Sequence, residues 1–146
     1  MALAANTVTP RPPLNLFEVE RRQLIGSGWV ELLEVPSYFI PRNGPNPERV
    51  VNCAAIMTGL TITNIHSQTI RASARIIGTD DQEYVVINET PIPTNDFLII
   101  RFDRQVMKSG ERLQVAIPSN VGPSVHAHVH FTYILNQREE FTIIEP

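Results

Sequence analysis

Three dense strand patterns follow one another between residues 91 and 135, separated by two turns. In the segments 97–102 and 125–135, one of the two sets of alternate positions is aliphatic or aromatic almost throughout, and a further strand pattern at 112–117 lies between them. Such an apolar parity is typical of antiparallel strands that bury one face and expose the other. Lys108-Ser109-Gly110-Glu111 supplies the glycine that a tight reversal needs. The region therefore predicts a compact antiparallel β-sandwich that leaves little chain for a catalytic apparatus.

Strand patterns recur through the rest of the chain at intervals of about 10 to 15 residues, without an amphipathic helix between them. These further segments are 29–35, 49–57, 60–65, 69–76 and 83–87. Residues 17–25 are ambiguous between a short helix and a strand. We therefore expect an all-β fold, an antiparallel β-sandwich of jelly-roll or immunoglobulin-like type with about eight strands, as a single domain over residues 17–146.

Residues 1–16 differ from the remainder because they are rich in proline. Proline has no amide donor and favours extended polyproline conformation, so this segment is unsuited to a central strand. Two interpretations stay open, a frayed terminus or an extended arm that lies on a neighbouring subunit. Under the second interpretation the candidate interface residues are Pro10, Pro12, Pro13 and Leu14.

Composition and charge exclude several classes of protein. Hydrophobic residues make up 42% and charged residues 18% of the chain, which argues against a disordered polymer. The net charge of −3 gives no reason to expect a nucleic acid partner. The single cysteine, Cys53, lies in an apolar run, so we expect it to be buried, in a protein that assembles in a reducing compartment. We find neither a signal peptide nor a membrane-spanning run, and we expect a soluble protein without a membrane partner.

Three of the four histidines, His126, His128 and His130, alternate along one predicted strand. Alternate residues of a strand share a face, and the opposite parity of 127–135 is apolar, so the imidazoles are expected on an exposed face. A His-x-His pair could hold zinc or iron, but a solvent-exposed or subunit-contact face is the preferred interpretation. We therefore expect no metal and no cofactor. Protonation of this row should weaken subunit association as the pH falls toward about 5, an effect that chelators would not reproduce.

No pattern of catalytic residues stands out. The sequence contains neither a Gly-x-Ser-x-Gly motif nor a glycine-rich phosphate loop. Asp80-Asp81 and Glu139-Glu140 are adjacent pairs, and neighbours in a strand point to opposite faces. The expectation is a protein without enzymatic activity and without catalytic residues. A metal-dependent enzyme built on the histidine row remains a third alternative.

The order of features from about Thr58 to Leu135 resembles a group of small phage virion proteins with a β-sandwich domain. Five steps carry the resemblance. They are Leu60–Asn64, Ile70–Ile77, the proline step Pro93–Leu98, the Lys-x-Gly-Glu step within Val106–Val115, and the final Val129–Leu135. The resemblance covers just over half of the chain and concerns strands and turns rather than functional groups.

The resemblance implies a structural component of a phage particle, in the neck, tail or baseplate, assembled in the host cytoplasm. Its partners would be other virion proteins and further copies of itself in a ring or symmetric cluster. Two alternatives stay open, a receptor- or carbohydrate-binding module of the virion and a capsid decoration (cement) protein. A carbohydrate-binding module needs exposed aromatic side chains, for which Trp29, Tyr38 and Phe39 are the candidates, although Trp29 is interpreted as a core residue.

Overall fold

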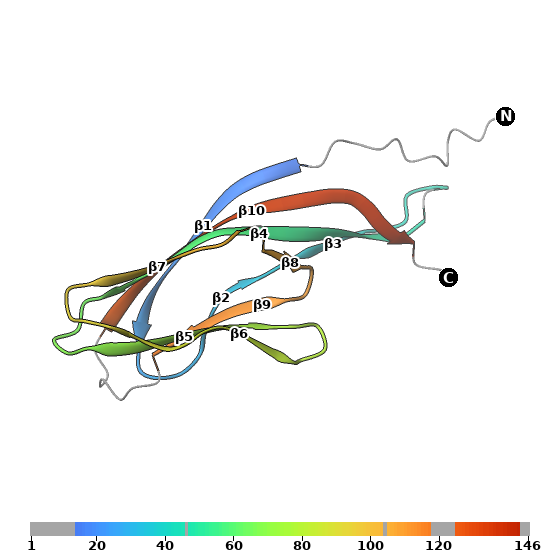
Figure 1. Ribbon diagram of the computed structural model, residues 1–146. Coiled ribbons are helices and arrows are strands. Elements are labelled where there is room, and N and C mark those ends of the chain that lie inside the picture. The colour runs from blue at the N-terminus through green and yellow to red at the C-terminus, as the bar shows by residue number, and fades with distance from the viewer. Residues whose placement is uncertain (1–13, 46, 104, 118–124, 144–146) are drawn as a thin grey trace.

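The computed structural model describes residues 14–45, 47–103, 105–117 and 125–143, and this part of the chain forms an antiparallel β-sandwich (Figure 1). The predicted fold class is confirmed. The strands are β1 (Leu14–Ile25), β2 (Val30–Glu34), β3 (Ser37–Ile40), β4 (Arg49–Asn64), β5 (Ile70–Ile77), β6 (Glu83–Ile92), β7 (Phe97–Arg101), β8 (Val106–Lys108), β9 (Arg112–Ala116) and β10 (Val125–Ile143). In the described ranges, no helix has the length and apolar character needed to cross a membrane.

The strands form two sheets. Sheet A has the order β1-β10-β4-β3, and β7 and β8 pair with further stretches of β4. Sheet B has the order β2-β9-β5-β6 and lies against sheet A as the second layer (Figure 1). Each sheet buries one face in the shared core. The opposite face of each sheet is turned outward, and the candidate interaction surfaces lie on these outer faces.

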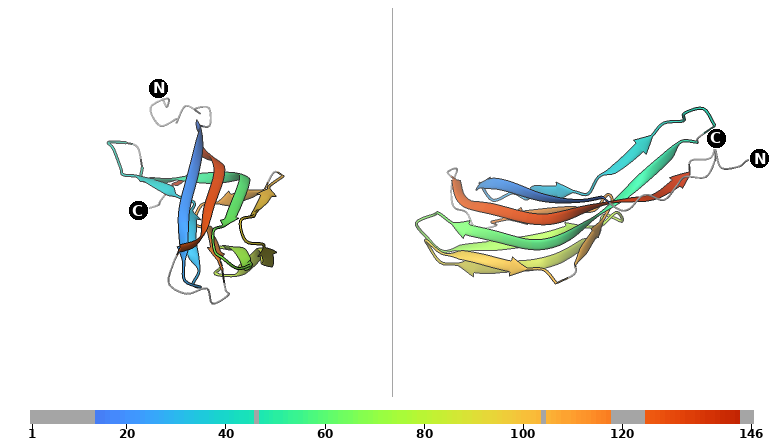
Figure 2. Two further views of the ribbon diagram at one scale, coloured as in Figure 1. Left: turned by 90° about the vertical axis from the view of Figure 1, so that its left-hand side faces the viewer. Right: turned by 90° about the horizontal axis from the view of Figure 1, so that it is seen from above.

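Two long strands, β4 and β10, organise sheet A. The sequence predicts separate strands at 49–57 and 60–65, but β4 runs through both segments. A register shift between Thr132 and Tyr133 of β10 absorbs the extra residue at Thr58 in β4 as a bulge. Figure 2 shows β3, with the adjoining ends of β4 and β10, reaching beyond the other strands. The chain therefore has a two-layer body and a single-layer extension.

The core lies between the sheets and follows the predicted parity of the last strand. Ala127, Val129, Phe131, Tyr133 and Leu135 are all buried. The Phe131 ring stacks on Tyr133 with centroids 5.2 Å apart, and it meets Phe102 edge-on at 6.4 Å. Burying a large apolar side chain of this kind contributes about 1.5–3 kcal/mol to folding. The predicted burial of Cys53 is also confirmed, and burial raises the pKa of its thiol.

The structure resolves or refines several boundaries. The ambiguous segment 17–25 is a strand, and β1 begins at Leu14, so the last three residues of the predicted arm pair with β10. Pro10, Pro12 and Pro13 lie outside the described residues. The short strands β3 and β8 were not expected. Gly110 has φ of 87°, as predicted for the turn before β9.

Candidate interaction surface

Five rows of side chains cross the outer face of sheet A from β1 through β10 and β4 to β7 or β8. Residues that pair directly across antiparallel strands point to the same side of a sheet, so the register defines these rows. They are Asn15–Asn136–Ala54–Lys108, Phe17–Ile134–Ile56–Val106, Val19–Thr132–Gly59–Arg101, Arg21–His130–Thr61–Ile99 and Gln23–His128–Thr63–Phe97. We call this set the A face.

The second row of the A face is apolar from edge to edge. Phe17 is 84% exposed and Val106 is 49% exposed, while Ile134 and Ile56 between them are half-buried. The outer face of an antiparallel sheet is ordinarily polar, because it contacts water. A continuous apolar row at this position costs solvation free energy, and such patches mark sites of contact with another molecule.

Further exposed apolar side chains extend this row. Val19 neighbours Phe17 on β1, and Ile99 and Phe97 lie on β7 at the opposite edge. Their exposed fractions are 40%, 49% and 56%. Threonine side chains occupy much of the space between them, with Thr58 Oγ1 2.8 Å from Thr132 Oγ1. Apart from its three basic residues, the A face is therefore a broad surface of apolar and uncharged polar side chains.

The charges on the A face have a single sign. Arg21, Arg101 and Lys108 are basic, and the five rows, all within the described residues, contain no aspartate or glutamate. The whole chain has a net charge of −3, so this surface differs in sign from the molecule that carries it. A patch of this kind favours approach of a partner with carboxylate groups.

Two of the three predicted histidines lie on the A face. His130 is exposed, and its Nδ1 accepts a hydrogen bond of 3.2 Å from Nε of Arg21. His128 is half-buried in the next row. Together with neighbouring residues of β1, they line a shallow depression of about 220 Å³. An imidazole beside a guanidinium suits a carboxylate or another hydrogen-bond acceptor from a partner.

The prediction that His126 shares this exposed face is wrong. His126 is buried, and its ring lies edge-on to His66 with centroids 6.5 Å apart. The register between β1 and β10 shifts at this point, so Ala127 pairs with Leu24 while Val125 pairs with Ile25. The resulting bulge at His126 interrupts the alternation of faces. No group of three or more potential metal ligands occurs among the residues that the structure describes.

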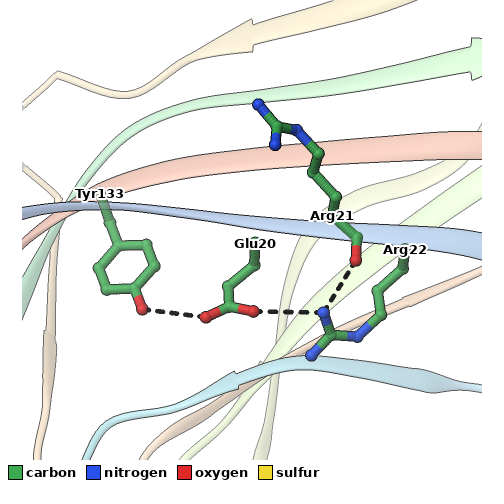
Figure 3. Close-up of polar contacts among 4 residues, drawn as sticks. All are labelled: Glu20, Arg21, Arg22 and Tyr133. Carbon is green, nitrogen blue, oxygen red and sulfur yellow. Dashed lines mark hydrogen bonds and ion pairs between the residues drawn. The ribbon is translucent and has the colours of Figure 1, made fainter.

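Contacts on the inner side hold β1 in place (Figure 3). The hydroxyl of Tyr133 donates a hydrogen bond of 3.3 Å to Oε1 of Glu20, and Nη1 of Arg22 donates one of 3.2 Å to Oε2. Burial, together with the negative charge and hydrogen bond of Glu20, raises the pKa of Tyr133 to about 12. The Tyr133 hydroxyl thus links β10 to the inner side of β1, and the register places Phe17 and Val19 on the outward side of the same strand.

The outer face of sheet B is organised differently. Trp29 stacks over the guanidinium of Arg75 at 3.9 Å, and Arg75 also donates a 3.0 Å hydrogen bond to Gln114 and lies 3.6 Å from Glu83. The interpretation of Trp29 as a core residue is wrong, because Trp29 is 41% exposed. It lies on the outward side just before β2, two residues from the outward-facing Glu31.

The three aromatic candidates for carbohydrate binding do not form one platform. Trp29 has one ring face covered by Arg75 on sheet B. Tyr38 and Phe39 are 43% and 57% exposed, but they belong to β3 of sheet A. As consecutive strand residues, these two side chains point to opposite sides.

The sequence did not reveal the apolar part of the A face. Phe17 and Val19 lie in a segment where both parities carry apolar residues, so alternation alone does not tell which side is buried. In β7, Phe97-Leu98-Ile99-Ile100 is apolar at every position for the same reason. Only the pairing of β1 with β10, and of β7 with β4, assigns these side chains to the exposed side.

No family model matches the chain, and no curated protein matches it. Solved structures that resemble it include infectious bursal disease virus, Gx strain, with a TM-score of 0.47 and 13% identity over 94% of this chain. The Gt strain follows with 0.45 and 13% over 94%, and the VP2 subviral particle of that virus with 0.33 and 13% over 90%. This chain spans 35–39% of the length of those chains. Likeness at this level does not bear on activity or partners.

Proposed function

We propose that this chain is a non-enzymatic structural subunit of a virus particle and that it assembles through its A face. The observation that carries the proposal is the apolar row of Phe17, Ile134, Ile56 and Val106, exposed on an otherwise well-paired sheet. A monomer that functions in solution gains nothing from such a row, whereas a subunit buries it on assembly.

The resemblance of residues 58–135 to small phage virion proteins supports the virion as the place of assembly. On that basis we propose a position in the neck, tail or baseplate of a phage particle. On sheet B, by contrast, Arg75 has internal partners in Trp29, Gln114 and Glu83. The A face has an exposed apolar row instead, which assembly would cover.

The proposal is tested with particles purified from a lysate that contains the chain. Mass spectrometry should find the chain in the particle fraction at a fixed copy number. A double variant, Phe17→Asp with Val106→Asp, should stay soluble and folded but should no longer co-sediment with particles. The control is Phe39→Asp, which alters another exposed aromatic residue, on β3 outside the five rows, and should be incorporated normally. Absence of the wild-type chain from particles would contradict the proposal.

A further inference from the structure

We propose that the occupant of the A face is a second copy of this chain, which docks head-to-tail with the acidic side of sheet B. This inference rests on the proposed function, since it takes the A face to be a subunit contact. It adds that the partner is another copy of the chain and that the two copies use different surfaces in the contact.

Charge disfavours the simplest alternative, in which two A faces meet across a two-fold axis. Such a contact would bring together Arg21, Arg101 and Lys108 from both copies with no carboxylate in the five rows to neutralise them. Like charges in a desolvated contact cost free energy and suppress association. A partner for the A face should therefore present carboxylates together with apolar side chains.

Sheet B and its turns carry that combination. Within the described residues 30–35, 70–92 and 109–117, seven side chains are acidic and three are basic. The acidic residues are Glu31, Glu34, Asp80, Asp81, Glu83, Glu89 and Glu111, and the basic residues are Arg71, Arg75 and Arg112. Arg75 is already engaged by Glu83 of the same chain, and Arg112 lies 3.7 Å from Glu31 and 3.9 Å from the exposed Asp81. The unbalanced charge on this side of the molecule is therefore negative.

The negative charge is concentrated where β5 turns into β6. Asp81 has a side chain that is 90% exposed, and Asp80 and Glu83 flank it in the sequence. Directly beyond them, Tyr84 and Val85 are 53% and 61% exposed. We call residues 80–85 the acidic tip. It offers carboxylates beside apolar side chains, which matches the arginines beside apolar side chains on the A face.

The acidic tip is preformed. The amide of Asp81 donates to the carbonyl of Gly78 at 2.9 Å, and the amide of Gln82 donates to Oδ1 of Asp80 at 3.1 Å. The hydroxyl of Tyr84 donates to Oδ2 of the same carboxylate at 3.2 Å. Because the turn is already ordered, docking loses little conformational entropy.

The two surfaces belong to opposite layers of the molecule (Figure 1). A contact between different surfaces of identical subunits is heterologous, so each bound copy presents a new A face or a new tip. Such contacts produce rings where the rotation closes and filaments where it does not. Variants that each lack one of the two surfaces can therefore distinguish a heterologous contact from a two-fold one.

Two double variants at exposed positions each remove one surface. The face variant is Arg101→Glu with Val106→Glu, and the tip variant is Asp81→Asn with Val85→Gln, which leaves the altered tip without a charge that could attract the altered face. Asparagine suits position 81, where φ is 61°. Circular dichroism checks that both variants fold. Where a double variant does not fold, the single substitution Val106→Glu or Val85→Gln takes its place. Sedimentation velocity is then recorded over a concentration series at about 0.05 M and about 0.5 M NaCl.

The wild-type chain should grow beyond a dimer as concentration rises, and salt should reduce this growth at least several-fold. Each variant alone should remain monomeric. An equimolar mixture should form one-to-one dimers and stop there, because only one competent face and one competent tip remain to pair. A wild-type chain that stays monomeric at low salt, a tip variant that associates like wild type, or a mixture that stays monomeric would each overturn the inference. If the wild-type chain stays monomeric but is still found in purified particles, this inference is wrong while the proposed function holds.

Discussion

The two outer faces of this sandwich present their exposed side chains in different ways. On sheet B, Arg75 lies between Trp29, Gln114 and Glu83, so these side chains are paired within the chain, whereas the acidic tip leaves Tyr84 and Val85 exposed. On sheet A, Phe17 and Val106 are exposed beside basic side chains that have no carboxylate in their rows. The same fold thus carries one face with internally paired side chains around Arg75 and one face with an exposed apolar row.

The largest effect should separate the core from the A face. Phe131→Ala removes a fully buried ring that packs on Tyr133 and Phe102, and it should lower the free energy of unfolding by about 3–5 kcal/mol. Phe17→Ala removes a ring of the same size from the outer face and should change it by less than about 0.5 kcal/mol. Urea unfolding of both variants measures the contrast. A large decrease in the free energy of unfolding for Phe17→Ala would mean that this ring stabilises the fold itself and is not reserved for contact with a partner.

The second effect distinguishes two histidines of one strand. His126→Gln alters a fully buried side chain beside His66 and should cost about 1–3 kcal/mol. His130→Gln, on the A face, should cost less than about 0.5 kcal/mol. Thermal unfolding at neutral pH compares them. Equal decreases in stability for the two variants would contradict the burial of His126 and would indicate that it shares the environment of His130.

These histidines also show which features of the fold the sequence predicts and which it does not. Alternation in 125–135 correctly predicts the buried set Ala127, Val129 and Phe131, because one parity is apolar throughout. It does not predict the burial of His126, because a bulge depends on the register with β1, which lies more than a hundred residues away in the chain. The A face was missed for a related reason. Where both parities are apolar, as in β1 and β7, only the partner strand decides which side is exposed.

The third effect concerns the inner contacts that hold β1 in sheet A. Tyr133→Phe removes the hydrogen bond to Glu20 and should cost about 1 kcal/mol near neutral pH. The pKa of Tyr133 is raised to about 12, above its ordinary value of about 10, so the folded state holds this proton more tightly than the unfolded state. The stabilisation is constant below pH of about 10 and is lost as the pH rises through 12. Unfolding measured across this range should show a decline that Tyr133→Phe reduces, and an unchanged slope would contradict the assignment.

The smallest effect tests the internal pairing around Arg75 on sheet B. Arg75→Ala should lower the free energy of unfolding by about 0.5–1 kcal/mol, since its contacts with Trp29 and Glu83 are partly exposed. The fluorescence of Trp29, the only tryptophan of the chain, should shift as the guanidinium is lost. Arg101→Ala is the matched control on the A face, where no change in stability is expected. If both arginines contributed equally to stability, the contrast between the two faces would disappear.

The central claim, that the A face is covered on assembly, is tested most directly by hydroxyl-radical footprinting of the chain alone and in its assembled state. Phe17, Phe97 and Phe39 are all more than half exposed in the isolated chain, so all three should be oxidised readily there. On assembly, Phe17 and Phe97 should be protected several-fold, while Phe39 on β3 should stay reactive. Undiminished oxidation of Phe17 and Phe97 in the assembled state would contradict the account.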